Sequence, residues 1–86
     1  MNNKVLVKVT VLELGISYDV FLPVNELIWK LKKLMIKSIS DLVNIPELYQ
    51  KEFLLLNKIT GEIYRNNDVL IDTNIRNATE LILLSI

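Results

Sequence analysis

The stretch KVLVKVTVL, residues 4–12, has a valine at every second position. Because the side chains of a strand alternate between its two faces and β-branched residues favour strands, this period of two predicts a first strand whose valines face the core. Gly15 then supplies a turn, and Tyr18, Val20 and Leu22 alternate with Ser17, Asp19 and Phe21. Residues 4–22 are therefore predicted to form an antiparallel β-hairpin.

The other end of the chain shows the same alternation. Leu81 and Leu83 alternate with Ile82 and Leu84 in residues 81–86, which predicts a last strand. Both strands are strongly hydrophobic, as strands at the centre of a sheet are. We therefore expect the first and last strands to lie side by side and parallel.

A helix is predicted directly after Pro23. Asn25 is a good N-cap residue, and Glu26 places a negative charge in the first turn, where the helix dipole favours it. Trp29 and Ile36 project from the arc opposite the apolar stripe. At about 100° per residue, that stripe, which we expect to cover the sheet, contains Val24, Leu27, Ile28, Leu31, Leu34, Met35 and Ile39.

The region between helix and last strand supplies shorter elements. Residues 40–51 have weak periodicity, and Pro46 predicts an irregular connection or one short helical turn there. Residues 53–56 read as a third strand, residues 62–65 as a short fourth strand, and residues 69–75 as a compact linker. The order predicts a single α+β domain over residues 1–86, a β-grasp in which a mixed five-stranded sheet packs on one main helix.

Composition excludes several functional classes. The chain of 86 residues has ten basic and ten acidic residues, and it lacks both cysteine and histidine. Zero net charge removes the long-range field that nucleic-acid binders use, so we expect no nucleic-acid partner. Disulfides, Cys/His zinc sites and catalysis by thiolate or imidazole are excluded. The apolar runs are far shorter than the ~18–20 residues of a membrane span, and no signal peptide is recognisable, so we expect a cytoplasmic protein without direct membrane insertion.

Candidate catalytic groups gather between residues 62 and 73 but form no convincing pair. They are Glu62, Tyr64, Asp68, Asp72 and Thr73. The favoured interpretation is local, with Asp68 serving a turn and Asp72 bonding nearby backbone N–H groups. Asn66 and Asn67 add oxygen atoms, but the regular spacing and closing glutamate of a calcium loop are missing. We expect no catalytic residue, no metal and no cofactor.

Two surfaces are candidate binding sites. The helix offers Trp29, Lys33 and Ile36 on its outer arc, among further lysines that predict either an acidic protein partner or a solvated face. A sheet covered by one helix leaves its other face open, and the strand alternation predicts an apolar patch there. The patch predicts a partner or self-association, unless loops and long polar side chains shield it; it consists of Leu6, Leu54, Leu56, Ile82 and Leu84.

The C-terminal third resembles a known family. Residues 70–75 (LIDTNI) and 80–83 (ELIL) resemble the Leu-x-Asp-x-x-Ile segment and last strand of ubiquitin, and the hairpin, the helix and Ile45-Pro46 lie where ubiquitin has its counterparts. Among ubiquitin-like proteins, residues 67–72 and 78–81 look most like the bacterial EsaB/YukD family. That resemblance implies a small cytoplasmic accessory of type VII (ESX-type) secretion systems, whose partners are protein components of a membrane-bound machine.

The last residues bear on the mode of action. Conjugation and sulfur carriage need a flexible tail that ends in two glycines, whereas this sequence ends Leu84-Ser85-Ile86 within the predicted last strand. We therefore expect non-covalent binding through the open sheet face. The alternative is a self-associating regulatory or structural protein, in which the same apolar patch closes a symmetric homodimer.

Overall fold

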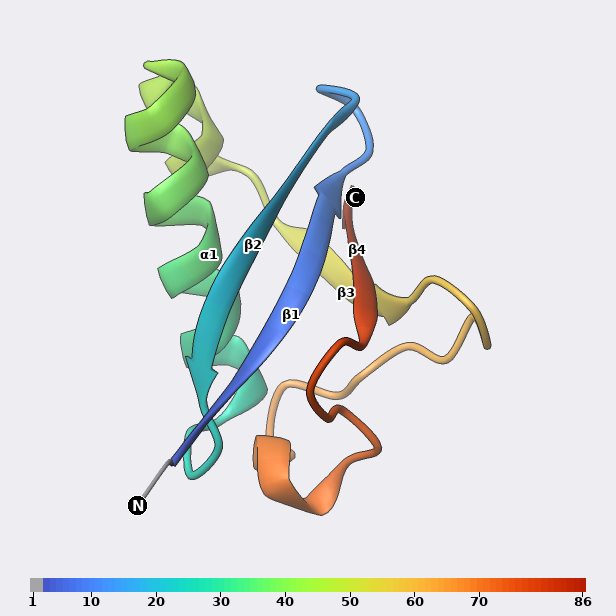
Figure 1. Ribbon diagram of the computed structural model, residues 1–86. Coiled ribbons are helices and arrows are strands. Elements are labelled where there is room, and N and C mark those ends of the chain that lie inside the picture. The colour runs from blue at the N-terminus through green and yellow to red at the C-terminus, as the bar shows by residue number, and fades with distance from the viewer. Residues whose placement is uncertain (1–2) are drawn as a thin grey trace.

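The computed structural model describes residues 3–86 and shows one long helix against a curved sheet (Figure 1). The sheet has four strands in the order β2-β1-β4-β3, in which β1 and β4 are parallel and the other neighbours antiparallel. The elements in chain order are β1 (Lys4–Val11), β2 (Ile16–Pro23), α1 (Ile28–Val43), the 3-10 helix η1 (Pro46–Gln50), β3 (Phe53–Asn57), the 3-10 helix η2 (Leu70–Asp72) and β4 (Glu80–Ser85).

The central strands follow the predicted alternation. Val7, Val9 and Val11 are at most 1% exposed, and they face the core together with Leu81 and Leu83. The parallel pairing of β1 with β4 is confirmed. Burial of these β-branched and leucine side chains between the sheet and α1 supplies the main stabilisation of the fold.

Strand β2 connects the sheet to the helix through a tyrosine. The Tyr18 hydroxyl donates a hydrogen bond to the Met35 carbonyl oxygen, at 2.9 Å. Burial disfavours the charged phenolate and raises the pKa of Tyr18 to about 12. This bond fixes an edge strand of the sheet against the middle of α1.

The start of α1 differs from the prediction. The helix begins at Ile28, and its N-cap is Leu27, which makes no capping bond through its side chain, so the prediction of an Asn25 cap was wrong. The Ile28 N–H instead donates to the Asp68 carbonyl at 2.9 Å, and the Trp29 N–H donates to Asn66 at 3.2 Å. The turn at residues 66–68 thus satisfies backbone donors that a side-chain cap would otherwise accept.

The rotation of α1 about its axis also differs. Leu34, predicted in the core, is 45% exposed, whereas Ile36, predicted on the outer arc, is only 6% exposed. Helix η1 packs against α1, and its Leu48 joins the same apolar cluster as Ile36. The flank that carries Ile36 is therefore covered by a segment for which the sequence predicted only an irregular connection or one short turn.

The predicted strand at residues 62–65 is absent from the described sheet, so the prediction of five strands was wrong. A single bridge joins Leu56 to Ile63, with the Tyr64 N–H donating to the Leu55 carbonyl at 2.9 Å. The pairing ends there because Asn66 and the residues after it are held at the start of α1 by the bonds described above. The chain must leave the edge of β3 to reach the helix.

Candidate functional site

The face of the sheet opposite α1, here called the open face, carries all five predicted residues. Leu6 is 39% exposed and Leu84 is 36% exposed, while the other three are half-buried by their neighbours. Leu54 lies directly opposite Leu84, and Leu56 opposite Ile82, across β3 and β4. The predicted positions are confirmed, and the role of these residues in binding stays a prediction.

Four of the five residues form one apolar block on neighbouring strands, and Ile63 extends it. Ile63 is 54% exposed and bridges to Leu56, which places both side chains on the same face. Ile63 was not predicted as a site residue, because the residues of the segment 62–65 were not assigned to either face of the sheet. The name β3–β4 block is used below for Leu54, Leu56, Ile63, Ile82 and Leu84.

A polar row separates Leu6 from the β3–β4 block. Lys8 lies opposite Asp19 of β2 on one side and Glu80 of β4 on the other. In the next row, Thr10 and Ser17 share a hydrogen bond of 2.8 Å between their hydroxyl groups. The open face is thus two apolar areas divided by charged and hydroxyl side chains, not the single patch that the sequence predicted.

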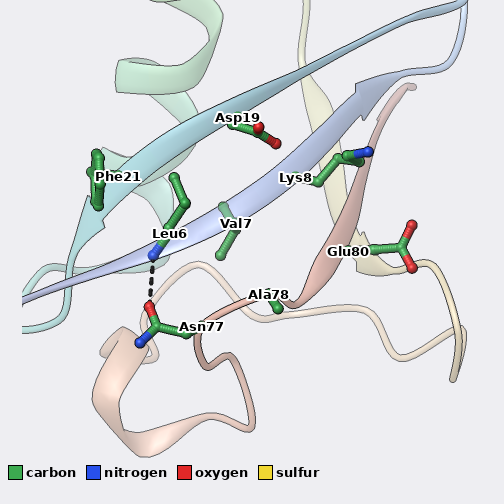
Figure 2. Close-up of a pocket in the computed structure, with 8 residues that line it drawn as sticks. All are labelled: Leu6, Val7, Lys8, Asp19, Phe21, Asn77, Ala78 and Glu80. Carbon is green, nitrogen blue, oxygen red and sulfur yellow. Dashed lines mark hydrogen bonds between the residues drawn. The ribbon is translucent and has the colours of Figure 1, made fainter.

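The second apolar area borders a hollow of about 710 Å³ beside Leu6, which is also lined by Lys8, Asp19 and Glu80 of the polar row (Figure 2). Phe21, which pairs with Leu6 and is 57% exposed, forms one wall. Asn77 holds the opposite wall, because its Oδ1 accepts the Leu6 N–H at 2.9 Å, and the Ala78 N–H donates to the Leu6 carbonyl at 2.8 Å. Phe21 was not predicted as a site residue, although the alternation along residues 17–22 places it outward.

Ala78, at the edge of this hollow, has a left-handed backbone with φ of 72°. For a residue with a side chain this conformation costs about 1–2 kcal/mol, which glycine avoids. Glycine in turn makes the unfolded chain more flexible, and this offsets part of the gain in stability. We expect Ala78→Gly to stabilise the protein by about 1 kcal/mol, measured by urea unfolding. A loss of stability in this variant would show that residues 76–79 do not adopt the left-handed turn.

The outer face of α1 keeps two of its three predicted residues. Trp29 is half-buried, and the ammonium groups of Lys30 and Lys33 lie 5.5 and 5.3 Å from the centre of its ring. Contacts of this kind add a modest cation–π attraction at exposed sites. Ile36 does not belong to this surface, because η1 and the core bury it.

Four of the five candidate catalytic groups are engaged in local structure, whereas the Asp72 carboxylate, expected to accept from backbone N–H groups, makes no hydrogen bond within residues 3–86. The Tyr64 hydroxyl donates to Asn74 Oδ1 at 2.6 Å and accepts from Asn57 Nδ2 at 3.1 Å. Burial raises the pKa of Tyr64, the bond from Asn57 lowers it, and the nearby Glu62 carboxylate raises it. The Tyr64 hydroxyl thus joins Asn57, at the start of the turn at residues 57–62, to Asn74 of the linker.

The neighbouring polar residues act in the same manner. The Thr73 hydroxyl donates to the Leu70 carbonyl at 2.6 Å, and Asp68 pairs with Arg65 at 3.6 Å. Within residues 3–86, no three acidic side chains gather in a geometry that could hold a metal ion. In the same range, every helix is too short or too polar to cross a membrane.

Comparisons with known proteins concern the fold. The sequence matches no protein-family model and no curated protein. The structure is similar to a chain of the MycP5-free ESX-5 inner membrane complex, with a TM-score of 0.79 and 18% identity over 99% of this chain. This chain covers only 21% of the length of that ESX-5 chain.

Two further solved structures share the arrangement. One is an N-terminal ubiquitin-like domain, with a TM-score of 0.64 and 19% identity over 96% of this chain and 75% of that domain's chain. The other is a chain of the phenol hydroxylase from Pseudomonas sp. OX1, with a TM-score of 0.75 and 12% identity over 96% of this chain and 74% of the other. These likenesses show that the chain shares the fold of a ubiquitin-like domain.

Proposed function

We propose that this chain is a ubiquitin-like interaction module that binds proteins without conjugation, as an accessory or regulatory component of a bacterial type VII (ESX-type) secretion system. The observation that carries the proposal is the β3–β4 block, an apolar surface on β3, β4 and the adjoining Ile63, in which Ile63 and Leu84 are exposed and the other three residues half-buried. Apolar side chains grouped in this way are typical of protein interaction sites.

The secretion context has two supports. Residues 67–72 and 78–81 resemble the EsaB/YukD family, and the fold is similar to that of a chain in an ESX inner membrane complex. A cytoplasmic protein with an exposed apolar block suits recruitment to the cytoplasmic side of such a membrane-bound machine. The proposal includes no catalytic activity, because the polar groups around Tyr64 are used to hold the turn and linker in place.

The open face also predicts how a partner would be oriented. The β3–β4 block supplies apolar surface from which water is excluded when a partner binds. The adjacent row of Lys8, Asp19 and Glu80 presents charges of both signs. A partner must match this row with its own charges, or leave buried charges unpaired at a high cost. Affinity therefore comes mainly from the block and orientation from the charged row.

The test is an affinity purification, after cross-linking, of the tagged protein from membranes of its own host. Leu84→Asp places a charge in the β3–β4 block and is expected to lower recovery of secretion-machinery proteins by about tenfold or more, which corresponds to about 1.4 kcal/mol. Leu42→Asp is the matched control, because Leu42 is 71% exposed on α1, in the other layer of the fold.

Three outcomes contradict the proposal. If Leu84→Asp recovers as much of the secretion proteins as the wild type does, the partner binds outside the block. Recovery of other complexes alone removes the secretion role. Recovery of the protein itself alone, with a dimer mass in light scattering that Leu84→Asp abolishes, assigns the block to self-association instead.

A further inference from the structure

A second concave surface lies at the edge of the sheet, where α1 meets the start of β3, and it borders the β3–β4 block at Leu54 and Ile63. Two hollows of about 490 and 570 Å³ adjoin there, because they share Lys32, Lys33, Lys51 and Glu52 as lining residues. Trp29 lies at one end of this surface and Lys37 at the other. The combined surface is called the lysine groove below.

The backbone N–H and C=O groups of the odd-numbered residues of β3 point toward the lysine groove. The Ile86 N–H donates to the Glu52 carbonyl, and the Lys58 N–H to the Glu80 carbonyl. Even-numbered residues of this strand therefore bond to β4, and the N–H and C=O groups of Phe53 point to the opposite edge. That edge of the sheet borders the groove.

Only the later part of this edge is covered by another segment of backbone. Residues 62–64 pair with β3 from Leu55 onward, where the Tyr64 N–H donates to the Leu55 carbonyl. At the start of the strand the Phe53 carbonyl accepts instead from Lys32 Nζ, at 2.8 Å. A flexible side chain thus occupies a position on the edge that the backbone of an added strand would take, and edges of this kind readily accept one.

The charge of the lysine groove is strongly unbalanced although the whole chain is neutral. Only one of the ten acidic residues, Glu52, lines it. Lys51 and Arg65 each pair with a carboxylate, whereas Lys33 and Lys37 form no ion pair within residues 3–86. Five of the ten basic residues line the two hollows: Lys32, Lys33, Lys37, Lys51 and Arg65.

We propose that the lysine groove binds an acidic segment of a partner protein in extended conformation, which adds its backbone to the edge of β3 at Phe53 and pairs its carboxylates with Lys33 and Lys37. Burial lowers the pKa of Lys32, against the opposing effect of the nearby Glu52 carboxylate. A partner carboxylate beside the Lys32 ammonium group would favour its charged form, and the Phe53 carbonyl would then be free to accept from the backbone of the added strand. Apolar side chains of the segment would contact Trp29 and Ile63.

A peptide suits this groove better than a nucleic acid. Single-stranded nucleic acids need free aromatic faces for stacking, and the ring of Trp29 already has Lys30 and Lys33 above it. Glu52 lies in the shared part of the groove, where it would repel a continuous phosphate backbone but fits between separate carboxylates. The complementary partner is an acidic peptide with an available backbone.

The test is selection of short random peptides displayed on phage against the folded wild-type protein, followed by affinity measurements on the selected peptides. We expect an excess of Asp and Glu over the starting library and an affinity that falls as salt rises. Lys37→Glu should weaken binding about threefold, and Lys33→Glu combined with Lys37→Glu about tenfold or more. Lys58→Glu, which reverses one charge outside the groove, should leave the affinity unchanged.

A further variant distinguishes binding to the lysine groove from binding to the open face. Leu84→Asp alters the open face but none of the residues lining the groove, so peptide affinity should persist in it. The proposal is overturned if no acidic peptides are selected, if the selected peptides bind the double variant as tightly as wild type, or if their binding depends on Leu84. A single-stranded oligonucleotide that binds as tightly as the peptides, and loses affinity in the same double variant, would assign the groove to nucleic acid instead.

Discussion

Leu83→Asp is expected to prevent folding. Leu83 is fully buried at the centre of the sheet, where it lies opposite Val11 of β1 and Leu55 of β3. An aspartate there would have to be buried without a partner or forced to stay protonated, at a cost of several kcal/mol, while small domains have a total stability of about 5–15 kcal/mol. Circular dichroism and urea titration should show no cooperative unfolding transition.

The neighbouring residue supplies the control. Leu84 is the next residue of the same strand and lies on the open face, where an introduced carboxylate stays hydrated. The Leu84→Asp variant should therefore unfold cooperatively, with a free energy of unfolding within about 1 kcal/mol of wild type. If Leu84→Asp unfolds the protein and Leu83→Asp does not, the strand is shifted by one residue and every assignment to the open face is exchanged.

Ile36→Ala is expected to lower the free energy of unfolding by about 2–4 kcal/mol, although Ile36 was predicted to be outside the core. Its side chain is 6% exposed and belongs to the apolar cluster that also holds Leu48, so the truncation leaves a cavity. Leu34→Ala should cost less than about 1 kcal/mol, because Leu34 is 45% exposed. Urea unfolding of the two variants measures the difference directly.

The opposite ranking of these two variants would be decisive. A larger loss for Leu34→Ala would mean that α1 presents the stripe predicted from the sequence and that η1 does not cover Ile36. Equal losses would mean that the flank of the helix under η1 is only loosely packed. Either result contradicts the packing of η1 on α1.

The faces of the central strands were predictable, because burial along a strand depends only on whether a residue is at an odd or an even position. Val9 and Leu81 face the core in a period of two, and neither position depends on where the connecting segments lie. The rotation of α1 does depend on them, since a helix of intermediate hydrophobicity is turned by whatever covers its flanks. The sequence around Leu48 has no period that would reveal this cover.

The failed strand at residues 62–65 has a similar cause. Its composition suits a strand, but Asn66 and Asp68 supply the carbonyl groups that receive the first N–H donors of α1. A bond between segments so far apart in the chain cannot be read from either of them. The predicted cap was therefore Asn25, a residue next to the helix with a side chain that is suited to capping.

The candidate site was predictable in part for the same reasons. The alternation along each strand placed Leu54 and Leu84 on the open face. Which residues lie side by side on neighbouring strands depends also on the register between β1 and β4. That register brings Lys8 beside Glu80 and so divides the apolar surface. The lysines of the outer helix face were predicted to favour an acidic protein partner or a solvated face, but the groove that they line beside β3 could not be predicted, because it exists where an expected strand does not form.

The parallel pair at the centre of the sheet affects how the chain folds as it is synthesised. Leu6 of β1 bonds to Asn77, 71 positions later, so β1 has only its hairpin partner β2 until residues 77–85 have left the ribosome. Closing so long a loop is entropically costly, and folds dominated by distant pairings assemble slowly. During that interval the valine-rich strand has one unpaired edge, and the nascent chain is exposed to aggregation or chaperone capture until β4 emerges and pairs with it.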